Sequence, residues 1–458
     1  MTPALFPYQR DAADAIGRAV KTTYNAMEPG LGKSAVACTV ASDLSVQRGM
    51  IGTPKSGEGV WRREIKKWWP DSPPVVAVHQ ASDVRAGPGV FIVPYSVLSV
   101  NEAVVAALRD APRMDFSILD EAHNLKNAFA KRTLAVLVEL RRVLGLAHPM
   151  SGTPAPNHLG ELWPILRAFR PDLIPSRLNP GRSMSQDEFE AHYLVKKLIT
   201  DPRSGRLVTV VEGSQNVAEL RERCKRFFLR ETKKRVLPDL PPLLFDVVPL
   251  EIPNPEQFRS LGQLLVDGRI EDDEALTEAA SIANATLYAE LGLAKAPAVA
   301  DYVTDLLEGG VKQVVVWAVH HAAIDHLCAA LAAYGVSKYD GRDSTAKRDV
   351  AVEGFLAGER RVFCGQIIAG GTVLTLMGGK LPCHDVVFAE SSFSALDNYQ
   401  AACRIHRIGQ HDAVLARFAS AVGTYDERIG EITARKAQDF ATMFDHQQET
   451  KAGVKYVH

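Results

Sequence analysis

The chain lacks the features of a membrane, secreted or disulfide-bonded protein. No apolar run approaches the length of a membrane span, and the N-terminus has no apolar segment typical of a signal peptide. The six cysteines contain no C-x-x-C pair, which argues against zinc-ligand spacing and against a disulfide framework. These absences predict a soluble, cytoplasmic chain with reduced thiols, without a targeting signal and without a membrane partner.

An excess of charge of either sign is also missing. The 53 Lys and Arg residues nearly balance the 54 Asp and Glu residues, which gives a formal net charge of −1. This balance excludes a uniformly basic coat, so any surface for nucleic acid must be a local groove. At 458 residues, 46% of them hydrophobic, the chain is longer than one ordinary core requires, and we expect two domains.

One segment has the pattern of a phosphate-binding loop. Its glycines let backbone N–H groups turn toward a phosphate, Lys33 can neutralise the β and γ oxygens, and the Ser34 hydroxyl can hold Mg²⁺. A buried helix is expected to follow, with the positive end of its dipole toward the anion. The general pattern has glycine where Met27 stands, so a glycine-rich turn remains the alternative for this segment alone. The segment reads Met27-Glu28-Pro29-Gly30-Leu31-Gly32-Lys33-Ser34.

A glutamine precedes this loop by about twenty residues. Phe6-Pro7-Tyr8-Gln9 leads into apolar residues at helical spacing. The amide of Gln9 is a group that can read an adenine edge, and an ordinary surface helix start is an equal alternative.

Apolar strands alternate with helical segments in the first part of the chain. We expect strands at residues 50–51, 75–78, 90–93, 116–119 and 143–146. Such alternation predicts a parallel sheet whose site lies at the C-terminal ends of the strands.

Two adjacent carboxylates, Asp120 and Glu121, leave the strand at residues 116–119. Buried carboxylates are costly unless a cation or a reaction uses them, so we expect Asp120 to take Mg²⁺ and Glu121 to polarise an attacking water. Together with Lys33 they predict hydrolysis of a nucleoside triphosphate. Ser151-Gly152-Thr153-Pro154 follows a later strand and offers hydroxyls that can sense the γ-phosphate.

The later part of the chain alternates again. We expect strands at residues 314–317, near 336, at 361–363 and at 386–389, with helices at 322–334 and 345–356. His320-His321 has no partner at metal-ligand spacing and is interpreted as a polar turn. Arg404 and Arg407 are three residues apart, which predicts that they share one helical face and can both point at a γ-phosphate; an exposed basic helix is the alternative.

The order of these motifs resembles the Swi/Snf-type branch of superfamily 2 helicases, which are double-stranded DNA translocases with two RecA-like lobes. Segments near Gly292-Leu293-Ala294-Lys295 look closest to its annealing-helicase or prokaryotic and viral subgroup. The matching motifs are Gly30 to Ser34, Thr53-Pro54 with Trp61, Glu64 and Trp68, Asp120 to His123, Ser151 to Asn157 with Glu161-Leu162-Trp163, and Gln400 to Gln410.

The resemblance implies roles for further residues. The family segment that matches residues 60–68 contacts one DNA strand, which implies DNA contacts for Arg62 and Lys66, and Asn157 would couple hydrolysis to DNA. Gly370 and Gly371 lie in a loop that would meet the DNA backbone, although Val373 replaces the usual glycine there. Arg404 and Arg407 would act as arginine fingers, and Gln400 would contact the nucleotide.

We therefore predict an α/β fold of two RecA-like lobes with parallel sheets, helical insertions and a C-terminal brace helix. Residues 1–170 would form the first lobe, 171–243 a helical protrusion and linker, and 244–458 the second lobe, with a helical insertion at about 253–290 and the brace at 425–444. The protrusion would hold a basic loop at 196–206, although a short hairpin has room within residues 196–211.

The predicted function is that of an ATP-dependent translocase on double-stranded or forked DNA, with ATP and Mg²⁺ as cofactors, that remodels or anneals DNA. No bromodomain-like, chromodomain-like or zinc-binding extension is evident, so we expect a minimal motor. One alternative is a strand-separating DNA or RNA helicase of the same superfamily. A catalytically silent nucleic-acid-binding scaffold is another, against which the intact Lys33, Glu121 and Arg407 argue.

Overall fold

The computed structural model describes most of the chain in two units, the first ending at Thr232 and the second beginning at Lys233. Described are residues 3–156, 158–200, 207–258, 285–370, 374–377, 379–392, 394–424, 426–427 and 429–430. The predicted insertion falls mainly on residues 259–284 and the predicted brace helix largely on residues after 430, outside the described residues. Whether residues 171–243 form a separate part stays a prediction.

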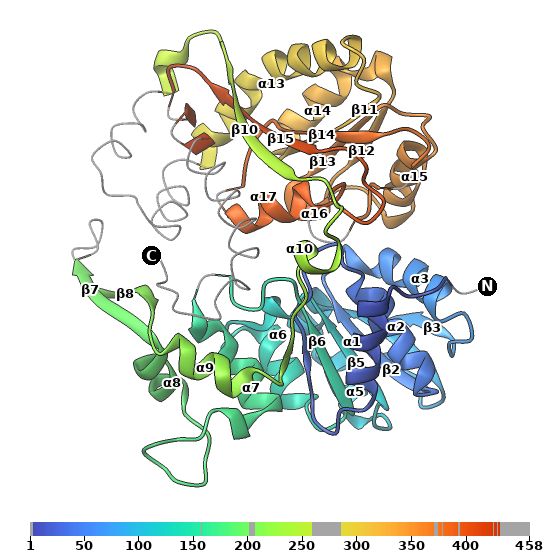
Figure 1. Ribbon diagram of the computed structural model, residues 1–458, viewed down its shortest axis with the longest axis vertical. Coiled ribbons are helices and arrows are strands. Elements are labelled where there is room, and N and C mark those ends of the chain that lie inside the picture. Colours follow the sequence, from blue (N-terminus) through green and yellow to red (C-terminus); the bar gives the residue numbers. More distant parts are fainter. Residues whose placement is uncertain are drawn as a thin grey trace. The chain divides into compact units, whose positions relative to one another are not determined.

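The first unit is built on a seven-stranded parallel sheet with the strand order β3-β4-β2-β5-β6-β1-β9 (Figure 1). The buried strand β2 pairs with β4 and β5 on its two sides, and β1 lies between β6 and β9. The strands are β1 (Tyr24–Asn25), β2 (Arg48–Thr53), β3 (Val75–Ala77), β4 (Gly89–Pro94), β5 (Phe116–Asp120), β6 (Leu146–Met150) and β9 (Phe228–Leu229).

Helices connect these strands and supply most of the remaining core. Their apolar positions recur at helical spacing, as in α5, where Val104, Val105 and Leu108 are buried. The helices are α1 (Pro7–Gly17), α2 (Lys33–Asp43), α3 (Gly57–Trp68), α4 (Tyr95–Val100), α5 (Glu102–Asp110), α6 (Lys131–Leu134), α7 (Trp163–Phe169), α8 (Gln186–Tyr193) and α9 (Val217–Cys224).

One strand of this unit differs from the sequence prediction. The strand expected at residues 143–146 is instead β6, which begins at Leu146. Gly145 turns the chain with a φ of +62°, and an added Cβ there would lie 2.0 Å from the carbonyl oxygen of Met114, so only glycine fits this turn. The polar His148, and Pro149, which is uncommon inside strands, weaken the strand pattern in the sequence, although both residues are buried in β6.

The basic loop predicted at 196–206 is regular structure over residues 196–200, and its residues 201–206 lie outside the described residues. β7 (Leu194–Thr200) and β8 (Leu207–Ser214) form an antiparallel two-stranded sheet that extends from the first unit in Figure 1. Lys196 and Lys197 lie within β7 and are exposed. β7 and β8 therefore pair as the two strands of the hairpin considered for residues 196–211.

The second unit has a six-stranded parallel sheet with the order β10-β15-β14-β11-β13-β12. Its strands are β10 (Leu243–Leu250), β11 (Gln313–Ala318), β12 (Val336–Tyr339), β13 (Val362–Gln366), β14 (Cys383–Phe388) and β15 (Val414–Ala421). Its helices are α10 (Lys233–Val236), α13 (Ala285–Glu308), α14 (His321–Ala330), α15 (Thr345–Leu356), α16 (Ile367–Gly370) and α17 (Ala395–Ala402).

Helices cover both faces of this second sheet. Along β11, Val314 and Val316 pack with residues of α13 and α14, whereas Val315 and Trp317 pack with residues of α15, α16 and α17. This alternation is expected for a parallel strand that is buried on both faces. The predicted fold class of two RecA-like lobes with parallel sheets is confirmed.

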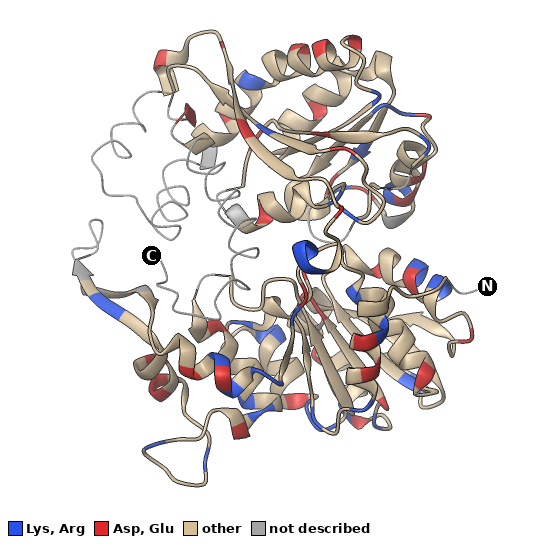
Figure 2. Cartoon of the chain, in the orientation of Figure 1, with Lys and Arg blue, Asp and Glu red and all other residues tan. Residues whose placement is uncertain are grey.

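Charged residues of both signs are interspersed on each unit, as Figure 2 shows, in keeping with the net charge of −1. Among the described helices, none combines the length and the apolar character that crossing a bilayer requires.

Candidate active site

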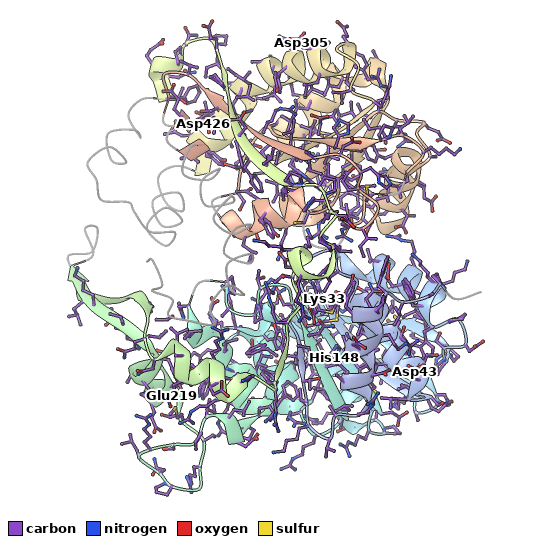
Figure 3. All side chains as sticks on the ribbon, in the orientation of Figure 1. Lys33, Asp43, His148, Glu219, Asp305 and Asp426 are labelled. Carbon is purple, nitrogen blue, oxygen red and sulfur yellow. The ribbon has the colours of Figure 1, made fainter. Side chains whose placement is uncertain are left out.

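The predicted phosphate-binding loop connects β1 to α2 in the first unit. Gly30 and Gly32 have φ values of +92° and +83°, in the region that favours glycine. α2 begins at Lys33, so the N–H groups of its first turn point back toward the loop. The Lys33 ammonium, labelled in Figure 3, donates to the Met27 carbonyl oxygen at 3.0 Å and thus lies across the loop. The loop has the form predicted from the sequence.

Met27 fills the position that holds glycine in the general pattern. Its backbone does not adopt a positive φ, and its side chain is fully buried. The Met27 N–H donates to the Asn25 side-chain oxygen at 3.2 Å. Because this conformation needs no glycine, the departure from the pattern leaves the loop intact.

Gln9 supports the loop from α1. Its side-chain N–H donates to the Leu31 carbonyl oxygen at 3.0 Å, and its side-chain oxygen accepts from the Phe6 N–H at 2.9 Å. A Cβ added to Gly32 would lie 2.3 Å from the Gln9 amide nitrogen, so glycine is needed for this close approach. Gln9 therefore fixes the loop through contacts within the chain, and its predicted role toward adenine stays a prediction.

Asp120 and Glu121 stand at the C-terminal end of β5, as expected, and both are buried. One Asp120 carboxylate oxygen accepts from the Trp61 indole N–H at 2.8 Å and from the Thr53 hydroxyl at 3.3 Å. The other accepts from the Glu121 N–H at 3.0 Å. Burial, and next the charge of Glu121, raise the pKa of the Asp120 carboxyl to about 6, while Trp61, Lys33 and Thr53 oppose the rise.

Glu121 is linked to the segment that begins at Ser151. The Ser151 hydroxyl donates to a Glu121 carboxylate oxygen at 3.3 Å and lies 2.8 Å from Nδ1 of His123. His123 Nδ1 is also 3.2 Å from the same Glu121 oxygen. Glu121 itself has a φ of +46°, an uncommon conformation for a non-glycine residue. The predicted γ-phosphate sensor thus contacts the predicted water-activating group directly.

Sequence reasoning missed Arg230 as part of this site. Its guanidinium donates to the carbonyl oxygens of Ala26 and Gly152, and thereby joins the phosphate loop to the segment after β6. The carbonyl oxygen of the next residue, Glu231, accepts from the Glu28 N–H at 3.1 Å. The signal in the sequence was a cationic run after two phenylalanines, which could equally be a solvated surface.

Arg404 and Arg407 lie in the second unit, and their predicted common helical face is wrong. α17 ends at Ala402, and both arginines follow in turns. They nevertheless converge, because each guanidinium donates to the carbonyl oxygen of Leu374, at 3.1 and 2.9 Å. Arg404 also binds the Gln400 carbonyl oxygen at 2.7 Å, which brings the predicted Gln400 into the same group.

The turn that carries these arginines is anchored by the first residue of the second unit. The buried Lys233 ammonium donates to the His406 carbonyl oxygen at 2.9 Å and lies 3.1 Å from His406 Nδ1. Burial, and next the Lys233 charge, lower the pKa of His406 to about 3, so its ring is neutral at pH 7. His406 Nε2 contacts the Pro241 carbonyl oxygen at 2.8 Å, which ties the turn to the linker as well.

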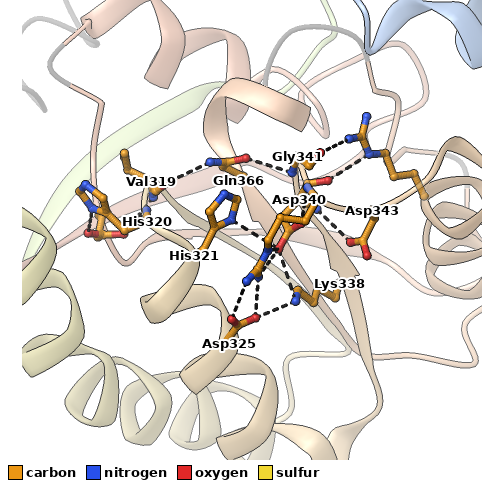
Figure 4. Close-up of polar contacts among 12 residues, drawn as sticks. Val319, His320, His321, Asp325, Lys338, Asp340, Gly341, Asp343 and Gln366 are labelled. Atoms are coloured by element: carbon orange, nitrogen blue, oxygen red, sulfur yellow. Dashed lines mark hydrogen bonds and ion pairs between the residues drawn. The ribbon is translucent and has the colours of Figure 1, made fainter.

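His320 and His321 each face a carboxylate, in agreement with the polar-turn interpretation (Figure 4). His320 and its backbone N–H bind Glu390, at 2.7 and 2.8 Å. His321 lies 3.5 Å from Asp340. The Arg342 guanidinium is held by Asp340 and Asp325.

The predicted DNA contacts are placed unevenly. Arg62 and Lys66 lie on the exposed side of α3. Gly370 is buried at the end of α16, where an added Cβ would lie 3.0 Å from the Trp317 ring. Asn157 and Gly371 are outside the described residues.

Comparison with known proteins gives one family. The family model described as SNF2-related domain matches residues 26–257, just over half of the chain. The DNA annealing helicase and endonuclease ZRANB3 of Mus musculus is 26% identical over 465 residues, which cover 97% of this chain and 41% of that protein. The SWI/SNF-related matrix-associated actin-dependent regulator of chromatin subfamily A-like protein 1 of Xenopus tropicalis is 27% identical over 451 residues, 94% of this chain and 44% of that protein.

The chain thus spans less than half the length of these curated relatives. Among solved structures, the Sulfolobus solfataricus SWI2/SNF2 ATPase core in complex with dsDNA matches with a TM-score of 0.45 and 19% identity, over 97% of this chain and 93% of that one. On the family match, which begins directly after β1 and includes the phosphate loop and the carboxylates at the end of β5, the chain belongs to the SNF2-related domain family.

Proposed function

We propose that this chain is an ATP-dependent translocase on double-stranded DNA, in which duplex DNA stimulates ATP hydrolysis and hydrolysis drives remodelling or annealing of DNA. The observation that carries the proposal is the set of groups in the first unit that suits nucleotide hydrolysis: the Lys33 ammonium across the loop and the buried Asp120 and Glu121 at the end of β5. The names of its relatives, which include DNA annealing helicases, support DNA as the polymer.

ATP is the substrate that the phosphate loop would hold. The loop from Gly30 through Leu31 to Ser34 would bind phosphate oxygens with its N–H groups, and Lys33 would neutralise their charge. Mg²⁺ fits this site, because burial and next the charge of Glu121 raise the pKa of the Asp120 carboxyl, and a nearby cation would offset both effects. Ser34 and Asp120 would hold the ion, which when bound would supply charge stabilisation at the phosphate oxygens.

Glu121 is the proposed general base for the attacking water. Its contacts with Ser151 and His123 fix the carboxylate direction, which is what a base needs before it can accept a proton from a positioned water. Ser151 would also respond to loss of the γ-phosphate, since Arg230 joins Ala26, at the start of the phosphate loop, to Gly152, the neighbour of Ser151.

Arg404 and Arg407 are proposed as arginine fingers, with Gln400 as a further nucleotide contact. Their shared acceptor, the Leu374 carbonyl oxygen, is neutral, whereas a phosphoryl oxygen carries charge and makes a stronger hydrogen bond with a guanidinium. The two arginines would stabilise the charge that develops on the transferred phosphoryl group.

DNA contacts are proposed for the exposed Arg62 and Lys66 on α3, and for Asn157, Gly370 and Gly371. Cationic side chains that meet phosphates give affinity without sequence preference, which suits a motor that must move along any sequence. Double-stranded or forked DNA is the proposed partner.

The decisive experiment measures ATP hydrolysis with duplex DNA, forked DNA, single-stranded DNA and RNA side by side. We expect the largest stimulation with duplex or forked DNA, and a loss of stimulation as salt rises because phosphate contacts release counterions. Glu121→Gln should bind nucleotide but not turn it over, and Lys33→Ala should lose binding. Normal turnover by Glu121→Gln, or stimulation by RNA and not by duplex DNA, would refute the proposal.

The hairpin of β7 and β8 favours a second candidate, a strand-separating helicase. A protruding hairpin is suited to divide two strands, and in this chain it presents Lys196 and Lys197. No aromatic residue occurs between Leu194 and Ser214 to stack on a separated base. Triplex displacement without unwinding of a blunt duplex is expected for the translocase, and efficient unwinding of that duplex for the helicase.

A further inference from the structure

The helix α3 has two faces with different partners. Arg62, Arg63, Lys66 and Lys67 are exposed, whereas Trp61 and Ile65 are buried toward the core of the first unit. A duplex bound to the exposed cations would therefore act on a helix whose other side is fixed in the protein.

The buried side of α3 contacts Asp120, the proposed Mg²⁺ ligand. Trp61 is only 1% exposed, and its indole N–H donates to Asp120 at 2.8 Å. An indole nitrogen is a donor only, and a buried donor without an acceptor is costly, so the bond fixes the ring and the carboxylate together. Trp61 is thus more than a packing residue of this helix.

A second donor to the same oxygen is coupled to the start of α3. The Thr53 hydroxyl donates to Asp120 at 3.3 Å, and Gly57 at the beginning of α3 packs on this threonine so closely that an added Cβ would lie 2.0 Å from the hydroxyl oxygen. The Gly57 N–H also donates to the Pro54 carbonyl oxygen at 2.8 Å. A shift of α3 would therefore displace the Trp61 donor directly and act on the Thr53 donor through its contact with Gly57.

We propose that Trp61 is a positioning residue that couples DNA phosphates on the basic face of α3 to the alignment of Asp120. The proposal rests on the function proposed above and names the path by which DNA would stimulate hydrolysis. A helix moves as a rigid element over a few turns, so phosphates that draw Arg62 and Lys66 outward change the contact of Trp61 with Asp120. Asp120 in turn holds the Glu121 N–H, next to the proposed base.

The test compares Trp61→Phe with Trp69→Phe in the full chain. Phenylalanine keeps an aromatic ring at position 61 and removes the N–H donor. Trp69 is also buried and lies about two helical turns beyond Trp61, so it controls for loss of a buried indole. We expect Trp61→Phe to lower the ATPase rate at saturating duplex about tenfold or more, the size typical of a lost hydrogen bond to a charged group, while Trp69→Phe retains it.

Two further measurements separate coupling from binding and from folding. Duplex affinity by fluorescence anisotropy should be unchanged in Trp61→Phe, whereas Arg62→Glu with Lys66→Glu should weaken it. Hydrogen exchange of the peptide 116–124, which contains the Glu121 N–H, should change on addition of duplex in the unaltered protein and not in Trp61→Phe. Thr53→Val removes the other donor without altering the aromatic core, and should also reduce stimulation by duplex. This variant tests the inference if Trp61→Phe fails to fold.

Three outcomes would overturn the inference. The first is full duplex stimulation in both Trp61→Phe and Thr53→Val, which would leave the proposed function standing. The second is a loss of duplex affinity in Trp61→Phe that accounts for its slower hydrolysis, since this would make the residue structural. The third is hydrolysis that no nucleic acid stimulates in the unaltered protein, and this would refute the proposed function as well.

Discussion

The replacement of Lys295 by methionine should destabilise the second unit strongly. Lys295 lies on α13 and is 1% exposed, and its ammonium is 2.6 Å from a carboxylate oxygen of the buried Asp426, which is labelled in Figure 3. It also donates to the Ala419 carbonyl oxygen of β15 at 2.8 Å. In Lys295→Met the Asp426 carboxylate would keep the Ala421 N–H, at 3.0 Å, as a donor but would lose its counter-charge.

The size of the effect follows from this geometry. Removal of one partner of a buried ion pair costs about 3–5 kcal/mol, because the remaining charge is neither solvated nor compensated. For a unit of this size each kcal/mol lowers the Tm by about 2–4 °C, so the Tm of the second unit should fall by on the order of 10 °C. The free energy of unfolding of the first unit should not change.

Hydrogen exchange is the suitable assay, because a chain of two units need not unfold in one step. Peptides from β14 and β15 should lose protection in Lys295→Met, whereas peptides from β2 and β5 serve as the internal reference. Lys21→Met removes an exposed partner of Asp172 and should cost less than about 1 kcal/mol.

The double variant Lys295→Met with Asp426→Leu removes both charges, and should recover most of the stability because apolar replacement of a whole buried pair is often neutral. The reasoning would be refuted if the free energy of unfolding of Lys295→Met lay within about 1 kcal/mol of that of the unaltered protein, or if the double variant were as unstable as Lys295→Met.

Three further predictions concern single residues. Burial lowers the pKa of His148 to about 4, so the unfolded chain, with an ordinary histidine pKa near 6.5, binds the proton more readily than the folded chain. The stability of the first unit should therefore be full above about pH 6.5 and fall by about 2 kcal/mol from pH 7 to pH 5, as measured by urea unfolding. His148→Gln should lose this pH dependence. Met27→Gly should lower the stability of the first unit by at least about 2 kcal/mol, because it empties a fully buried position, and nucleotide titration should show no gain in affinity. Arg407→Ala should lower the maximal hydrolysis rate about 10³-fold with little change in nucleotide affinity, and an equal fall in both would contradict its role in the transition state.

Local patterns predicted much of the fold of both units and the chemistry of the first. The helix at residues 345–356 was predicted with the bounds that α15 has, and its N-cap, Ser344, lies directly before it and accepts from the Lys347 N–H. The carboxylates at the end of β5 followed from an apolar strand that ends in two charges. In both cases the signal and the structure that it specifies share the same few residues.

Contacts between distant segments were harder to predict. Arg230 binds the carbonyl oxygen of Ala26, 204 residues away, and Lys233 binds His406, 173 residues away. Spacing within a segment carries no information about such partners. The helical face expected for Arg404 and Arg407 failed for the same reason, because the turn after Ala402 is held by the loop at Leu374 and by Lys233.

The short strand β9 sets the order in which the first unit can be completed as the chain is made. β1 pairs with β9, and the phosphate loop after β1 is bound by Arg230 and Glu231, which are among the last residues of the unit. At a synthesis rate of about 5–20 residues per second, roughly 10–40 s would pass between the synthesis of β1 and that of β9. During that time the edge of β1 can pair with other strands. A chain cut at residue 170 would keep every predicted nucleotide-binding residue of this unit and still lack β9, the strand that pairs with the outer edge of β1.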